Sequence, residues 1–299
     1  MTTRLSLYDR VAEETAGTVI RRYSTSFGLA SRLLEPTVRQ HVENIYALVR
    51  VADEIVDGGV TEAGLGTEDA RRYLDEFEVE THAAMSSGYS TNLVIHAFAL
   101  TAREVGIGTD LTTPFFHSMR MDLTDTEHDA ESFATYVYGS AEVVGLMCLE
   151  AFLHGTEPTA DEKARMVAGA RALGAAFQKV NFLRDLSADV ETLGRSYFPD
   201  IVVAELTDEQ KHELLDDIDA DLAQSAAVLP MLPSGSRRAV ALAQGLYQEL
   251  AARLRRTPAE RLIRSRVRVP DPVKLRIAGG VLLGRLPQPQ PQHPRKVIA

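Results

Sequence analysis

The chain has 299 residues, of which 45% are hydrophobic, so it can bury a sizeable core as one large domain or two ordinary ones. Its formal net charge of −10 argues against a nucleic-acid partner, which would require a basic face. The single cysteine, Cys148, cannot form an internal disulfide, and we interpret it as a small core residue of a protein from a reducing, cytoplasmic compartment. The N-terminus lacks the apolar segment of a secretory signal. No transmembrane helix is expected, because Glu142 and Glu150 interrupt the most apolar stretch, residues 137–153.

Helical periodicity accounts for every strong pattern in the chain, and no alternating strand pattern of useful length occurs. The expected helices span residues 7–22, 36–57, 68–87, 91–105, a stretch that begins at Pro114, and residues 132–152, 161–191, 205–228 and 237–256. No repeat or shift of composition divides them, so the fold class is all-α in a single domain, residues 1–287. Residues 288–299 form a proline-rich tail that we expect to be disordered.

A hydroxyl-rich segment follows the first helix. Ser24, Thr25 and Ser26 are typical of a loop and an N-cap before the next helix.

The helix that begins at Pro36 carries two carboxylates in apolar company. In YALVRVADEIVDG, the side chains of Tyr46, Arg50, Asp53 and Asp57 fall within about 60° of one another on a helix. The rest of this helix is apolar on most of its circumference, which places it in the interior. Buried carboxylates are costly unless they are paired or bind a metal, so both aspartates are candidate ligands. The arginine is either a salt-bridge partner of Asp53 or a donor to a phosphate group.

A second polar stripe lies on the long helix of QKVNFLRDLSADVETLGRSYFP. Asn181, Asp185 and Asp189 stand at i, i+4 and i+8 within about 80°, with Gln178 at the edge and Arg184 flanking. The carboxylates repel one another unless a cation lies among them. Oxygen ligands suit Mg²⁺, which takes one or two carboxylates and completes its shell with water and phosphate oxygens. One acidic pair is often just a solvated helix face, but two such stripes in one chain favour a metal site.

These two stretches resemble the aspartate-rich signatures of the squalene/phytoene synthase family, the head-to-head prenyl synthases. The segments RRYSTSFGLASRLL, MRMDL and YVYGSAEVVGLM agree with it, and the similarity extends from about Arg21 to Lys274. It implies an isoprenoid synthase-type helical bundle around a central cavity, with the two aspartate stripes facing each other across the mouth.

The resemblance also implies roles for individual residues. Mg²⁺, with Mn²⁺ as an alternative, would be held by Asp53, Asp57, Asn181, Asp185 and Asp189. The diphosphates and the first part of the prenyl chains would be bound by Ser24, Thr25, Ser26, Phe27, Tyr46, Arg50, Gln178, Asn181 and Arg184. Lys274 is either a further diphosphate contact or a solvated surface lysine. Tyr46, Tyr138 and Tyr247 would line the path of a carbocation, because an aromatic face attracts a cation. Glu142 stands where the family usually has a small residue, which leaves the shape of the adjacent pocket wall open.

The leading functional hypothesis is phytoene synthesis in carotenoid biosynthesis, in which two geranylgeranyl diphosphates join through a cyclopropyl diphosphate without a nicotinamide cofactor. The alternative is a C15 reaction that gives squalene, dehydrosqualene or presqualene diphosphate from farnesyl diphosphate. A hypothesis of another class is a non-catalytic binding or assembly protein with the same fold, which loss of the acidic residues would indicate. Peripheral membrane association would suit such lipid substrates, and the oligomeric state stays open.

Overall fold

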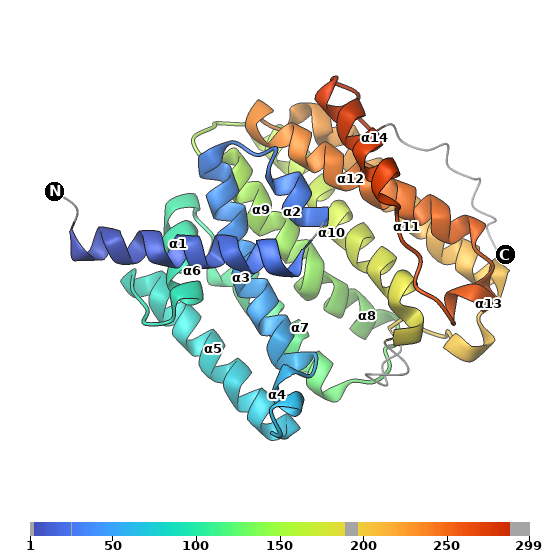
Figure 1. Ribbon diagram of the computed structural model, residues 1–299, viewed down its shortest axis with the longest axis horizontal. Coiled ribbons are helices and arrows are strands. Elements are labelled where there is room, and N and C mark those ends of the chain that lie inside the picture. Colours follow the sequence, from blue (N-terminus) through green and yellow to red (C-terminus); the bar gives the residue numbers. More distant parts are fainter. Residues whose placement is uncertain (1–2, 25, 189–196, 288–299) are drawn as a thin grey trace.

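The computed structural model describes residues 3–24, 26–188 and 197–287, and this part of the chain contains helices and loops but no β-strand (Figure 1). The helices are α1 (Arg4–Tyr23), α2 (Ser26–Ser31), α3 (Pro36–Val56), α4 (Gly59–Glu62), α5 (Thr67–Ser87), α6 (Leu93–Val105), α7 (Thr109–Thr124), α8 (Ala130–Val137), the π-helical turn η1 (Tyr138–Glu142), α9 (Val143–Leu153), α10 (Ala160–Ala188), α11 (Asp208–Val228), α12 (Ser234–Arg256), α13 (Ala259–Leu262) and α14 (Asp271–Leu282). The all-α prediction is confirmed. Thr25, Asp189 and the proline-rich tail lie outside the described residues.

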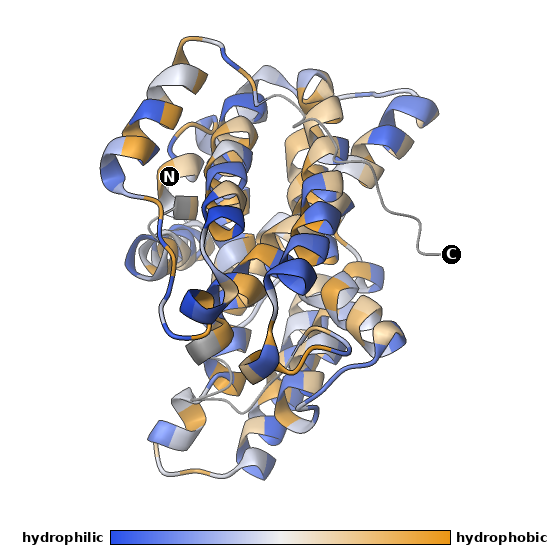
Figure 2. Cartoon of the chain, turned by 90° about the vertical axis from the view of Figure 1, so that its right-hand side faces the viewer, coloured by the Kyte–Doolittle hydropathy of each residue, from blue (hydrophilic) through white to orange (hydrophobic). Residues whose placement is uncertain are grey.

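The helices pack around two large hydrophobic cores. One core joins α3, α5, α6, α7 and α9, and Leu48 and Phe98 are among its fully buried residues. The other joins α10, α11 and α12 through residues such as Leu183, Leu215 and Leu254. Figure 2 shows hydrophobic and hydrophilic residues alternating around the helices, as expected for helices that bury one side. Consequently α3 belongs to one core and α10 to the other.

Helix boundaries differ from the prediction where a local signal is ambiguous. Pro114 lies inside α7, which begins at Thr109, not at the proline. Proline has no N–H, so α7 loses only one backbone hydrogen bond at this position, the one to the carbonyl of Asp110, and the helix continues through it. The end of the long helix agrees with the prediction: α3 ends at Val56, and Gly58, directly after the C-cap Asp57, adopts a left-handed conformation with φ of 114° before the short helix α4 begins.

The single helix expected over residues 132–152 is interrupted by the π-helical turn. At Gly139, an added Cβ would lie 2.2 Å from the backbone oxygen of Pro114. At Gly174 on α10, it would lie 2.5 Å from the backbone oxygen of Ala141. The turn is therefore held tightly between α7 and α10, and such π-bulges frequently occur at functional sites.

One continuous helical stretch, Ala130–Leu153, is long and apolar enough to cross a membrane by length and composition, the only one among the described residues. Half of it is buried inside the structure, as in the core helix of a globular protein.

Candidate functional site

A cavity of about 490 Å³ lies between α3 and α10, and side chains from α1, α2, α7, α8, η1, α9, α11 and α12 contribute to its wall. Its lining changes from apolar to polar residues toward the C-terminal end of both α3 and α10. On α3 it runs from Val42 and Ile45 to Asp53 and Asp57. On α10 it runs from apolar residues near Met166 to a polar group that ends at residue 185. The cavity is thus apolar at one end and polar at the other, which suits a molecule with a hydrocarbon tail and a charged head.

The α3 side of the polar end contains Tyr46, Arg50, Asp53 and Asp57, so all four predicted residues of this stripe line one wall. The Arg50 guanidinium pairs with Glu54, lies 4.0 Å from Asp53 Oδ2, and stacks over the ring of Tyr23 at 4.6 Å. Its Nε is buried without a hydrogen-bond partner among the described residues. A buried donor left unsatisfied is costly, and an anion in the cavity would satisfy it.

Asp53 has an unusual protonation equilibrium. Burial raises the pKa of its carboxyl to about 7, and repulsion from Asp57 and Asp122 adds to the rise while Arg50 opposes it. The side chain keeps 32% of its surface accessible because it faces the cavity. A cation placed beside it would reverse this shift, since an opposite charge favours the ionised form.

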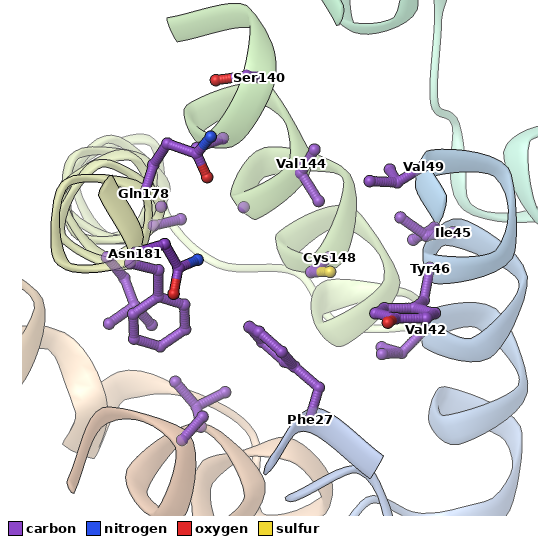
Figure 3. A pocket seen from close by; sticks show the side chains of 18 of the residues that line it. Phe27, Val42, Ile45, Tyr46, Val49, Ser140, Val144, Cys148, Gln178 and Asn181 are labelled. Atoms are coloured by element: carbon purple, nitrogen blue, oxygen red, sulfur yellow. The ribbon is translucent and has the colours of Figure 1, made fainter. Parts of the chain in front are cut away.

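The opposite wall carries Gln178, Asn181, Arg184 and Asp185 of α10. Figure 3 shows Gln178 and Asn181 projecting into the cavity from this helix, across from Tyr46. The structure therefore brings together the described members of both predicted stripes.

Two arginines cover the carboxylate of Asp185. Arg184 Nε donates to Asp185 Oδ1 at 2.9 Å, and Arg266 Nε lies 2.7 Å from the same oxygen. Arg266 belongs to the loop between α13 and α14, and the sequence analysis missed it. A separation of 81 residues in the chain gives no periodic signal that would connect the two.

The structure places neither Tyr138 nor Tyr247 in the cavity lining. Tyr138 does not line the cavity: its ring lies 5.2 Å from the Arg171 guanidinium, whose Nε bonds Glu142 at 2.6 Å. Glu142 is likewise absent from the lining, so it does not shape the cavity wall directly. Tyr247 stands behind the lining, where its ring stacks on Phe177 at 3.8 Å and its hydroxyl lies 3.3 Å from Asn181 Oδ1.

A second group that the sequence analysis missed lines the cavity on the α7 and α8 side. The hydroxyl of Tyr136 donates to both carboxylate oxygens of Asp122 at 3.0 Å, and the hydroxyl of Tyr197 approaches the same carboxylate at 3.3 Å. All three residues belong to the lining. Tyr136 and Tyr138 are two positions apart on a helix and point about 200° away from each other, so only one can face the cavity.

The remaining predicted residues divide between cavity and surface. Phe27 lines the cavity and meets Phe177 edge-on at 5.6 Å (Figure 3). Ser24 caps α2, since its Oγ accepts from the Phe27 amide at 3.1 Å, as the capping interpretation expected. Ser26 begins α2. Lys274 does not line the cavity, because its helix, α14, packs on the outer side of α12. Its Nζ lies 3.1 Å from the Asp271 carboxylate.

The donor set is consistent with a hard cation that completes its shell from the substrate. Among the described residues, no three His, Cys, Asp or Glu side chains converge closely enough to hold an ion by themselves. The carboxylates and amides instead lie on two facing walls. Magnesium is commonly held by one or two carboxylates together with phosphate oxygens, so these residues fit Mg²⁺ bound with a diphosphate.

Comparisons with known proteins agree with this arrangement. The family model described as squalene/phytoene synthase matches residues 20–272. The 15-cis-phytoene synthase of Enterobacter agglomerans is 29% identical over 77% of this chain and 82% of its own length. A bifunctional lycopene cyclase/phytoene synthase of Leptosphaeria maculans is 25% identical over 79% of this chain, which spans 45% of that longer protein.

Solved structures support the fold. A dehydrosqualene synthase superposes with a TM-score of 0.75 at 20% identity, covering 92% of this chain and 97% of that one. A squalene synthase from Alicyclobacillus acidocaldarius gives a TM-score of 0.71 at 20% identity, covering 84% and 95%. Because the family model spans most of the sequence, this chain belongs to the squalene/phytoene synthase family.

Proposed function

We propose that the protein is a Mg²⁺-dependent prenyltransferase that condenses two geranylgeranyl diphosphates head to head into phytoene. The observation that carries the proposal is the cavity with two facing polar walls at one end and an apolar interior at the other. The phytoene synthase names of the relatives from Enterobacter agglomerans and Pseudescherichia vulneris support the choice of the C20 substrate.

The overall reaction needs no oxidant or reductant. The first half forms a bond between the two prenyl chains, releases one diphosphate and one proton, and gives a cyclopropyl diphosphate. The second half releases the other diphosphate, rearranges the cation and loses a second proton to give the central conjugated triene. A nicotinamide cofactor is therefore not required, whereas squalene formation would need a hydride.

The residues of this chain would divide the work between the two ends of the cavity. When bound, Mg²⁺ would neutralise the charge that develops on the leaving diphosphate. Asp53, Asp57 and Asp185 would hold the metal ions, with Asn181 and Gln178 assisting, and Arg50 and Arg184 would donate to phosphate oxygens. Asp189 stays a predicted ligand outside the described residues.

The interior would protect the carbocation. The aromatic lining residues Phe27, Tyr136 and Phe182 present rings that attract a cation, and the apolar wall excludes water that would quench it. The Asp122 carboxylate, which accepts from two tyrosine hydroxyls, adds negative charge to the same wall.

A product assay tests the proposal and its alternatives. The full chain would be given farnesyl or geranylgeranyl diphosphate separately, with Mg²⁺ or Mn²⁺ and no nicotinamide, and the hydrocarbon identified by mass. A C40 hydrocarbon with a central conjugated triene is expected from the C20 substrate. A C30 hydrocarbon or presqualene diphosphate as the sole product would move the assignment to the C15 alternative. No product from either substrate, in protein shown to bind Mg²⁺ and diphosphate, would favour the non-catalytic alternative.

A further inference from the structure

The C-terminal part of the chain has a charge opposite to that of the whole. Between residues 253 and 287 there are ten arginines and lysines but only Glu260 and Asp271 as acids, a net charge of +8 in a chain whose total is −10. Six of the ten cations pair with carboxylates, four of them with acids outside the segment, so the exposed positive charge rests on the remaining arginines, Arg261, Arg268, Arg276 and Arg285.

Helix α14 lies within this basic segment and packs on α12 (Figure 1). Its inner side is anchored by Val281, which is 3% exposed and belongs to a core with Leu242 and Leu246. Its outer side is unusual because it is apolar: Leu275 is 67% exposed, and Leu282 and Leu283 are 54% and 82% exposed. Single exposed leucines are common on protein surfaces, but three within nine residues form a patch.

Two arginines lie in the same stretch as these leucines. Arg276 and Arg285 are exposed, and neither has an ion-pair partner within the part of the chain that the structure describes. We define the α14 face as Leu275, Arg276, Leu282, Leu283 and Arg285. Exposed leucines beside these two arginines can dock at a membrane surface, with the apolar side chains among the lipids and the cations at the headgroups.

We propose that the α14 face docks the protein on an anionic lipid surface. Charge complementarity selects this occupant, because an acidic protein is repelled by such a surface everywhere except where its own charge is positive. The position also connects docking with the cavity. Ile277 of α14 packs against Gly245 of α12, and Val240 and Ala243 of the same helix line the apolar part of the cavity. One helix thus separates the docked face from the space proposed for prenyl chains.

The test is cosedimentation of the full chain with vesicles of phosphatidylcholine alone or mixed with phosphatidylglycerol. Binding is expected only to the mixed vesicles, and it should weaken as salt is raised. The paired substitution L282E/L283E should lower the vesicle affinity by at least about tenfold, and R276E/R285E should lower it by about the same factor. The matched control is Val79→Glu on α5, another exposed apolar residue at 69%, which should bind as the wild type does.

Three outcomes would overturn the proposal: no binding of the wild type to anionic vesicles, unchanged binding of both α14 variants, or an equal loss in V79E. A dimer in solution that L282E/L283E dissociates would assign the face to a second copy of the chain instead. Far-UV circular dichroism and melting of each variant exclude unfolding as the cause. Because vesicle binding is measured without product formation, failure of docking and failure of the proposed reaction are distinguishable.

Discussion

The hydroxyl of Tyr136 on α8 donates to both carboxylate oxygens of Asp122 on α7, at 3.0 Å each, on the wall of the cavity. Burial, followed by the charge of Asp122, raises the pKa of this tyrosine well above its usual value, so it stays a neutral phenol at physiological pH. The pair fixes the ring at the point where the wall combines an aromatic face with a negative charge.

Tyr136→Phe should lower kcat for hydrocarbon formation by about tenfold while KM changes little, because a hydrogen bond to a charged group is worth about 1.5–3 kcal/mol. Tyr138→Phe is the matched control from the same helical segment, and it should retain nearly full activity because its ring lies outside the cavity lining. Steady-state kinetics of both variants checks this. A larger loss in the Tyr138 variant would contradict the assignment of Tyr136.

Tyr247→Phe keeps the ring that stacks on Phe177 but removes the hydroxyl that lies 3.3 Å from Asn181 Oδ1. Groups that orient a metal ligand typically contribute about 10- to 100-fold to metal affinity. The Mg²⁺ concentration for half-maximal activity should therefore rise by about tenfold, with little change in kcat at saturating Mg²⁺. If only kcat falls, the tyrosine acts on the substrate and not through Asn181.

Arg266→Gln should raise KM for the prenyl diphosphate by about tenfold, since a cation that pairs with the cavity-lining carboxylate of Asp185 is lost. This arginine pairs with the carboxylate of Asp185, so the same variant should bind Mg²⁺ at least as well as the wild type by calorimetry. Arg264→Gln is the control, because that residue pairs with Glu260 on the surface. A parallel loss of Mg²⁺ and substrate affinity in Arg266→Gln would rule out this role.

Asp53→Asn should stabilise the metal-free protein at neutral and alkaline pH. The folded-state pKa of about 7 lies above the ordinary aspartate pKa of 3.8, so between these pH values the folded state keeps a proton that the unfolded chain releases. The stability that goes with protonation is full below about pH 4 and is lost as the pH rises through 7. An asparagine cannot ionise, and it avoids this loss.

In the presence of a chelator, the melting temperature of the asparagine variant should rise relative to that of the wild type between pH 4 and pH 7. Above pH 7 it should stay about 2–4 °C higher than that of the wild type. That interval corresponds to about 1 kcal/mol in a domain of this size, and part of the full effect is screened because the side chain is partly accessible. Added Mg²⁺ should stabilise the wild type more than the variant. Equal melting temperatures at pH 8 without metal would show that Asp53 is not held in a costly ionised state.

The sequence by itself determined the all-α class and the coherence of each polar stripe. Helical periodicity is local, so the i, i+4 spacing of Asn181 and Asp185 was enough to place both on one side of α10. The same argument placed Arg50 and Asp53 together on α3. The short helices α13 and α14 were missed: α13 is a single turn of four residues, and in α14 two glycines and exposed leucines obscure the amphipathic pattern.

Only the tertiary structure decided which residues meet. The facing of α3 and α10 depends on how two cores pack against each other, and Arg266 reaches Asp185 only after the chain has folded back across the bundle. The choice between Tyr136 and Tyr138 depended on the rotation of one helical segment between its neighbours, which the close contacts at Gly139 and Gly174 fix. Periodicity defines the sides of a helix, but only packing against other helices determines which side faces the cavity.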